Sequence, residues 1–271
     1  MIFINVVKRF FKERFFDQAA QTAYYLLLSM FPFLISIFAL VSYLPVDEEM
    51  LLAFIKPFAP TEAYHIIEQN VRSIIFKVQG KVLYTSLAIA FWVSSVAVQS
   101  LARSLDQANG YVRRYPFWKV LIRDLAVTLL FMLVLSSSLF LPLLERALHE
   151  FVTYYDSVEQ WRGWLYIWPN VKWGLGSLFL FLFFLLFYKF VPTGKMKLKE
   201  VWPGALFSAI GWQLFSLIFG NYVANVDYTR IYGQLSGIIL LVLWFYLTAV
   251  ILMLSGLLNS EWRRSLTWRG K

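Results

Sequence analysis

The chain has 271 residues, of which 59% are hydrophobic, 19% aromatic and only 15% charged, and its mean hydropathy is +0.61. Soluble domains carry about 25% charged residues, so this composition excludes an ordinary soluble enzyme and a disordered chain. The chain has no cysteine, which excludes disulfides, thiolate metal sites and cysteine nucleophiles. Its net charge is +9, and this excess of basic residues needs an explanation.

The first 18 residues predict an amphipathic helix that lies in the membrane interface. Apolar residues recur at helical spacing from Phe3 to Phe11, opposite Asn5, Lys8, Arg9 and Lys12. Such a helix buries its apolar side among the acyl chains and keeps its lysines among the head groups. A solvated basic segment is the alternative interpretation.

Six apolar stretches then predict six transmembrane helices. In chain order they are residues 21–44, 82–102, 125–144, 173–188, 201–226 and 231–260. The fourth stretch is short, but it is long enough for a crossing if Lys189 extends to the interface. We expect an all-α integral membrane protein with one six-span domain over residues 1–271, and further interfacial helices in the outer connections 45–81 and 145–172.

The distribution of Lys and Arg predicts the orientation, because cytoplasmic segments carry the excess of positive charge. With a cytoplasmic N-terminus, 17 of the 25 basic residues fall in cytoplasmic segments and 8 in outer segments, so both termini are expected in the cytoplasm. Basic residues should then form an inner rim, comprising Arg103, Arg113, Arg114, Lys119, Lys195, Lys197 and Lys199. Topology thus explains most of the net charge, and we expect no nucleic-acid partner.

Residue types that perform hydrolytic or metal chemistry are scattered along the chain. The two histidines, His65 and His149, fall in different outer connections, and the carboxylates are single or flank the spans. A metal hydrolase needs such groups clustered around an ion. We therefore expect no metal, no cofactor and no enzymatic activity. Charged residues at the inner boundary, such as Asp106, Arg123 and Asp124, are interpreted as interfacial anchors.

Small and polar residues share one face of each of the last two predicted spans. In the fifth span the face contains Ala205, Ala209, Gln213, Ser216 and Gly220, and in the sixth it contains Gly233, Gly237, Trp244, Thr248, Ser255 and Asn259. Close helix packing is the simpler explanation, and the GxxxG spacing at Gly233 and Gly237 predicts such a contact. The alternative is a polar path for a substrate, for which the candidates are Gln213, Ser216, Asn221 and Thr248.

Several strings resemble the YihY family, also called the BrkB virulence-factor family. The strings lie at Asp17 and residues 19–32, 100–109, 192–205, 222, 231–235, 243–246 and 256–261. The positions that we assign to the family motifs are Asp17, Tyr24, Tyr25, Ser29, Pro32, Asn109, Tyr232, Gly233 and Trp244. The resemblance therefore runs through nearly the whole chain.

This resemblance implies a multi-pass protein of the bacterial plasma (inner) membrane. Some members of the family carry the label ribonuclease BN, and others are associated with serum resistance or with envelope lipid export. From the residues and the resemblance together we expect a protein that moves or handles a lipid-like or amphiphilic substrate, with membrane lipids as partners. The alternatives are a structural protein that binds other envelope proteins and, less favoured by the residues, a membrane-anchored ribonuclease.

Overall fold

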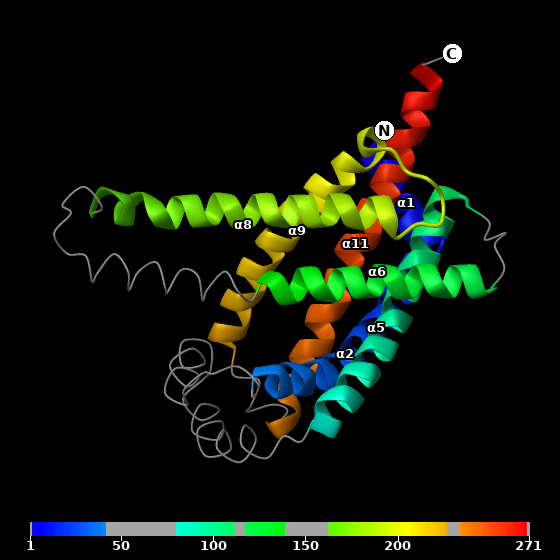
Figure 1. Cartoon of the computed structure of the whole chain (residues 1–271). Coiled ribbons are helices and arrows are strands. Elements are labelled where there is room, and N and C mark those ends of the chain that lie inside the picture. The colour runs from blue at the N-terminus through cyan, green and yellow to red at the C-terminus, as the bar shows by residue number, and fades with distance from the viewer. Residues whose placement is uncertain (1, 42–79, 112–116, 139–161, 227–232, 270–271) are drawn as a thin grey trace. The chain divides into compact units, whose positions relative to one another are not determined.

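The structure is a computed structural model, and it describes residues 2–41, 80–111, 117–138, 162–226 and 233–269. Over these residues the chain forms helices and connecting turns without any strand, which confirms the all-α prediction for the described part. The helices are α1 (Ile2–Lys12), α2 (Phe15–Val41), α5 (Gly80–Asn109), α6 (Phe117–Ser138), α8 (Arg162–Phe190), α9 (Leu198–Asn225), the 3-10 helix η2 (Gly233–Leu235) and α11 (Ser236–Arg269), as Figure 1 shows.

Each of the six predicted spans overlaps one long helix, because a continuous apolar stretch can satisfy its backbone within lipid only as a helix. Within the described residues, four helices contain segments long and apolar enough to cross a membrane: Leu87–Asn109, Trp173–Phe190, Leu198–Asn225 and Ser236–Leu266. These segments support a membrane location, whereas crossings by α2 and α6 stay predictions. Helix α8 begins at Arg162, well before the predicted span. The interfacial helices predicted in 45–81 and 145–172 lie mostly outside the described residues.

Two residues with positive φ angles mark helix boundaries. Gly110, at φ 69°, ends α5: its N–H donates to the Gln107 carbonyl over 3.0 Å, and the Tyr111 N–H donates to the Asp106 carbonyl over 2.8 Å. This pair of bonds is the Schellman arrangement, which needs a left-handed residue and so favours glycine. Arg14, at φ 57°, separates α1 from α2 and lets the chain turn between the two helices.

The described chain divides into two compact units, one formed by Tyr25–Val96 and the other by Met1–Tyr24 together with Ala97–Lys271. The second unit contains α1, the first part of α2, the last part of α5, and helices α6, α8, α9, η2 and α11. Apart from the bond between Ser29 and Leu26 in the first unit, the contacts discussed below lie within this second unit. The single domain predicted over residues 1–271 stays a prediction.

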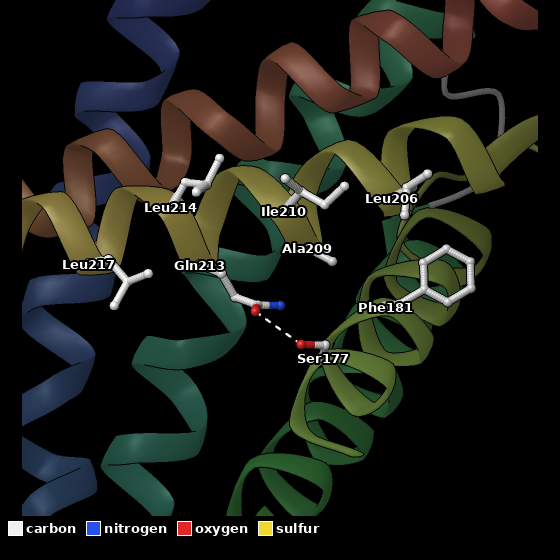
Figure 2. Close-up of a pocket in the computed structure, with 8 residues that line it drawn as sticks. All are labelled: Ser177, Phe181, Leu206, Ala209, Ile210, Gln213, Leu214 and Leu217. Atoms are coloured by element: carbon white, nitrogen blue, oxygen red, sulfur yellow. Dashed lines mark hydrogen bonds between the residues drawn. The ribbon is translucent and has the colours of Figure 1, made fainter. Parts of the chain in front are cut away.

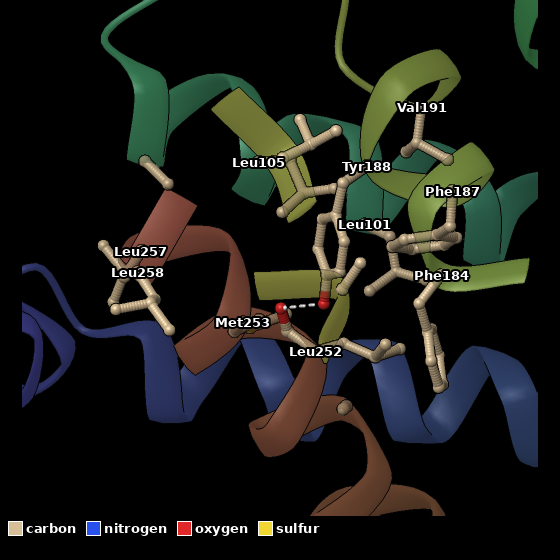
Figure 3. Close-up of a cluster of buried hydrophobic side chains, with 14 of the residues drawn as sticks. Leu101, Leu105, Phe184, Phe187, Tyr188, Val191, Leu252, Met253, Leu257 and Leu258 are labelled. Carbon is tan, nitrogen blue, oxygen red and sulfur yellow. Dashed lines mark hydrogen bonds between the residues drawn. The ribbon is translucent and has the colours of Figure 1, made fainter. Parts of the chain in front are cut away.

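The core of this unit lies where α8, α9 and α11 meet, around the fully buried side chain of Tyr188 (Figure 3). Its hydroxyl donates to the Leu252 carbonyl of α11 over 2.9 Å and lies 2.7 Å from the Ser208 hydroxyl of α9. Because the tyrosine proton is used on the carbonyl, Ser208 is the donor of the second bond. One phenol thus bonds α8 to both neighbouring helices.

Tyr188→Phe should lower the free energy of unfolding by about 1 to 3 kcal/mol, because it leaves a buried hydroxyl without its acceptor. Reversible unfolding in detergent would measure this change. The control is Tyr84→Phe, since Tyr84 is 72% exposed and should tolerate the change. Equal effects of the two substitutions would contradict the bonding of Tyr188.

The close helix contact predicted at the start of the sixth span is not found among the described residues. A Cβ atom built on Gly233 or Gly237 meets no described atom within 4 Å. A Cβ atom on Gly204 would instead lie 2.4 Å from the Ser255 carbonyl oxygen and 2.4 Å from the Asn259 Nδ2 atom. The small-residue face of α9 therefore packs against the C-terminal part of α11, whereas the GxxxG spacing indicated its N-terminal part.

Pro203 in the second turn of α9 frees a backbone carbonyl that α11 satisfies. Proline has no N–H, so the Lys199 carbonyl has no partner four residues along. The Trp262 indole donates to this carbonyl over 3.2 Å, and the Asn259 Oδ1 atom accepts the neighbouring Gly204 N–H over 2.7 Å. Two side chains of α11 thus replace ordinary helix bonds and fix the start of α9.

Candidate functional site

A groove between α8 and α9 has a volume of about 240 Å³ and is predominantly apolar (Figure 2). Its lining residues are Ser177, Phe181, Leu206, Ala209, Ile210, Gln213, Leu214 and Leu217. Gln213 and Ser177 are its polar members, and they point toward each other from the two helices in Figure 2. We refer to this site as the α8–α9 groove.

The two polar residues form one hydrogen bond, in which the Ser177 hydroxyl donates to the Gln213 Oε1 atom over 3.0 Å. A carboxamide also carries two N–H donors on its Nε2 atom. Among the described residues, no hydrogen-bond acceptor for these donors is found. The groove therefore offers an uncharged donor pair to a molecule that brings its own acceptor.

The groove lies on helices of bilayer-spanning length, and its apolar rim is exposed in the described part of the chain. Gln213 lies 15 residues after the first residue of α9, which corresponds to about 22 Å along a helix, within the thickness of a hydrocarbon core of about 30 Å. The apolar residues around it are exposed, with 51% for Ile210, 54% for Leu214 and 51% for Leu217.

The other candidates for the substrate path do not line the groove. Ser216 and Thr248 each carry a buried hydroxyl oxygen that has no hydrogen-bond partner in the described part of the chain. Asn221 is exposed, and its carbonyl accepts from the Asn225 side chain over 2.7 Å. Only Gln213 of the four predicted path residues contributes to the groove.

The residues predicted for the basic inner rim are exposed wherever the structure describes them, namely at Arg103, Lys119, Lys195, Lys197 and Lys199. Arg113 and Arg114 lie outside the described residues. Three of the exposed lysines lie at the start of α9 and in the loop before it. Exposure leaves their ammonium groups available to head groups, as the prediction requires.

The family-motif positions are spread over several elements. Asp17 is exposed and pairs with Arg14 over 2.8 Å, and Ser29 is buried and bonds to the Leu26 carbonyl over 2.8 Å. Tyr24, Tyr25 and Pro32 lie in α2, Asn109 ends α5, Gly233 lies in η2 and Trp244 lies in α11. Tyr232 lies outside the described residues. Asn109 is the member that adjoins a polar cluster, described next.

The side chain of Arg9 joins three helices at the end of the unit where α1, α5 and α11 meet. It donates to both Glu13 carboxylate oxygens, the Ser260 hydroxyl, the Glu261 carboxylate and the Ala108 carbonyl, at 2.6 to 3.2 Å. These five bonds use all five N–H groups of the guanidinium. We call these residues the Arg9 cluster.

Burial of Arg9 by itself lowers its pKa, but hydrogen bonds and attraction from Glu13 and Glu261 outweigh burial and raise the pKa above its ordinary value. The guanidinium is therefore charged at every pH at which the protein can be handled. The cluster contains a permanent positive charge at a nearly buried position, with 14% of the side chain exposed. Its role is to fix α1 against α11 rather than to transfer protons.

The loop between α8 and α9 is held by three helices. Asp106 of α5 accepts the Thr193 N–H over 2.7 Å, and Arg123 of α6 donates to the Val191 carbonyl over 3.0 Å. Arg263 of α11 donates to the Met196 sulfur of the loop over 3.6 Å and lies over the Tyr111 ring, 4.8 Å from the centroid. Asp106 and Arg123 thus hold the loop that leads from α8 to α9, beyond the anchoring predicted for them.

Ser177 and the Arg9 cluster were not predicted as functional features. Ser177 interrupts a long apolar run directly after Gly174 and Gly176, which was a usable signal for a polar point in that span. The prediction that Arg9 lies on the polar side of α1 is wrong, because its side chain reaches Glu261 from the docked side, where Val6 and Phe10 are buried. Among the described residues, no group of three or more His, Asp or Glu side chains could hold a metal ion.

Comparison with known proteins gives matches along almost the whole chain. Residues 6–269 match the family described as virulence factor BrkB. The ribonuclease-like protein YfkH of Bacillus subtilis (strain 168) is 31% identical over 245 residues, which cover 90% of this chain and 88% of that protein. UPF0761 membrane proteins of Xanthomonas campestris pv. campestris (strain 8004) and Xanthomonas axonopodis pv. citri (strain 306) are 29% identical over 263 residues, or 94% of this chain. The chain spans 59% of the length of these Xanthomonas relatives. No solved structure matches the chain.

Proposed function

The chain belongs to the virulence factor BrkB family, and from this premise we propose that it is a membrane protein that binds and moves a lipid-like, amphiphilic molecule. The observation that carries this proposal is the pair of Gln213 and Ser177 in an otherwise apolar groove on two helices of bilayer-spanning length. The groove binds the substrate, and the basic residues at the start of α9 receive its head group.

The chemistry of the groove defines the substrate class. The Gln213 donors, which have no acceptor in the described part of the chain, suit a carbonyl or phosphodiester oxygen, and the apolar walls suit an acyl chain. An uncharged donor costs less to hold within lipid than an ionised group does, so the polar group can pass without a buried counter-charge. The substrate is therefore a lipid whose ester or phosphodiester oxygen bonds to Gln213 while its tails stay in the bilayer.

Transport of this kind requires a defined topology, for which we propose six crossings by α2, α5, α6, α8, α9 and α11 in the bacterial plasma membrane, with both termini in the cytoplasm. The cysteine-free chain allows single-cysteine labelling without background. In intact cells, Ser157→Cys should react with an impermeant maleimide, whereas Ser265→Cys should react only after the membrane is permeabilised. Labelling of Ser265→Cys in intact cells would reverse the orientation.

Gln213→Leu should abolish most of the lipid movement while changing the free energy of unfolding by less than about 2 kcal/mol, because hydrogen bonds between membrane helices contribute little. The measurement uses purified protein in liposomes and follows the transbilayer movement of an anionic fluorescent phospholipid. Ser216→Ala is the matched control on the same helix, and it should move lipid at the wild-type rate. If both variants slow the lipid movement, the longer polar path along α9 is favoured instead. If the wild-type protein moves no lipid, a structural role is favoured.

Ribonuclease activity is the alternative raised by the name of the Bacillus relative. Cleavage of RNA by highly purified protein, dependent on an added divalent metal ion, would favour that alternative over lipid handling.

A further inference from the structure

Helix α1 has two different faces. Val6 and Phe10 are buried, and Arg9 reaches the Arg9 cluster from the same side. Apolar side chains that remain exposed by 51% to 72% lie next to this docked face: Phe3, Ile4, Val7 and Phe11. We call these four residues the α1 stripe. Its exposure means that docking on α11 accounts for only part of the apolar surface of α1.

A basic edge borders the α1 stripe. At about 3.6 residues per turn, Lys8 and Lys12 project on the side of the stripe that lies away from the docked face. Both lysines are exposed. The order around the helix is therefore docked face, apolar stripe, basic edge, which is the pattern of a helix lying in the surface of an anionic membrane.

The α1 stripe also continues the exposed apolar surface of α9. The Phe3 ring lies 6.2 Å from the Phe207 ring of α9, measured between centroids. The residues of α9 beside Phe207 are exposed and apolar, with 41% for Leu206 and 51% for Ile210. Because α9 has the length and composition of a membrane span, the same bilayer that surrounds α9 can cover the stripe.

From these three observations we infer that the α1 stripe binds the bilayer surface and that Lys8 and Lys12 bind anionic head groups there. Each basic residue near an anionic leaflet is attracted to its head groups. A protein partner bound to the α1 stripe would not explain why the stripe is continuous with the exposed apolar surface of α9. The Arg9 cluster then connects this membrane contact to the ends of α5 and α11. This inference stands independently of the lipid movement proposed above.

Nitroxide labels at single cysteines in the full-length protein test this inference. Val7→Cys reports from the stripe and Asn5→Cys from the opposite, polar side. In phosphatidylcholine nanodiscs that contain phosphatidylglycerol, the label at position 7 should collide more often with oxygen than with a water-soluble nickel complex, and the label at position 5 should show the reverse. Equal access of the nickel complex to both labels would overturn the inference.

A second measurement tests the role of the two lysines. Lys8→Gln combined with Lys12→Gln should reduce the oxygen preference at position 7 to the value found without phosphatidylglycerol. Lys8→Arg combined with Lys12→Arg keeps the charge and should retain the wild-type value. If the glutamine pair leaves the preference unchanged, anionic head groups do not hold α1, and this part of the inference fails.

Discussion

Gly204→Ala should lower the free energy of unfolding by about 3 kcal/mol, at the upper end of what overpacking usually costs. The added Cβ would lie 2.4 Å from a backbone oxygen of Ser255, and a helix backbone cannot move aside as a side chain can. The substitution would also displace Asn259, which accepts the Gly204 N–H. Unfolding of the detergent-solubilised protein by a denaturant would measure the loss.

Two other glycines serve as controls for Gly204. In Gly256→Ala the new Cβ would lie 2.3 Å from Cδ2 of Leu105, the far end of a flexible side chain, so the cost should be smaller. In Gly237→Ala it would meet no described atom within 4 Å, and the better helix propensity of alanine could stabilise the protein by up to about 1 kcal/mol. A loss at Gly237 as large as that at Gly204 would contradict the packing of α9 on α11.

Arg9→Gln should have the second large effect, also about 3 kcal/mol. Breaking a buried ion pair typically costs about 3 to 5 kcal/mol, because the remaining charge stays buried without its partner. The lower end applies here, since Glu261 keeps a second partner in Arg264 at 3.0 Å. The Ala108 carbonyl and the Ser260 hydroxyl would lose a donor as well.

Arg14→Gln provides the matched control for Arg9. Arg14 also pairs with a carboxylate, that of Asp17 at 2.8 Å, but the two side chains are 77% and 47% exposed. Exposed ion pairs contribute about 0 to 1 kcal/mol. If the free energies of unfolding of the two variants agree, the Arg9 cluster does not stabilise the docking of α1.

The long helices could be predicted from the sequence because each depends on a local property, an apolar stretch of bilayer length. The packing faces were predictable only in part. Ala205 and Asn259 are buried as a small-residue face requires, whereas Gly233 and Gly237 carry the same pattern without a described neighbour. Periodicity identifies a face of a helix, but it does not determine which part of that face another helix covers.

The contacts that define the polar sites depend on distant parts of the chain. Arg9 and Glu261 are 252 residues apart, so Arg9 could be counted only as one of many basic residues. Gln213 was identified because an amide within a span needs a partner. Its partner Ser177 lies on another helix, and no local pattern relates the two residues. Pairing across helices is therefore the part of the site that required the structure.

Crosslinking of a lipid to the groove tests the central claim most directly. Purified protein is reconstituted with a phospholipid that carries a photoreactive group in its acyl chain, and the crosslinked residues are mapped by mass spectrometry. Lipid binding at the α8–α9 groove predicts enrichment at Leu206, Ile210, Leu214 and Leu217, and loss of that enrichment in Gln213→Leu. Labelling that is equal along all exposed apolar residues of α9, and unchanged in Gln213→Leu, would contradict lipid binding at this groove.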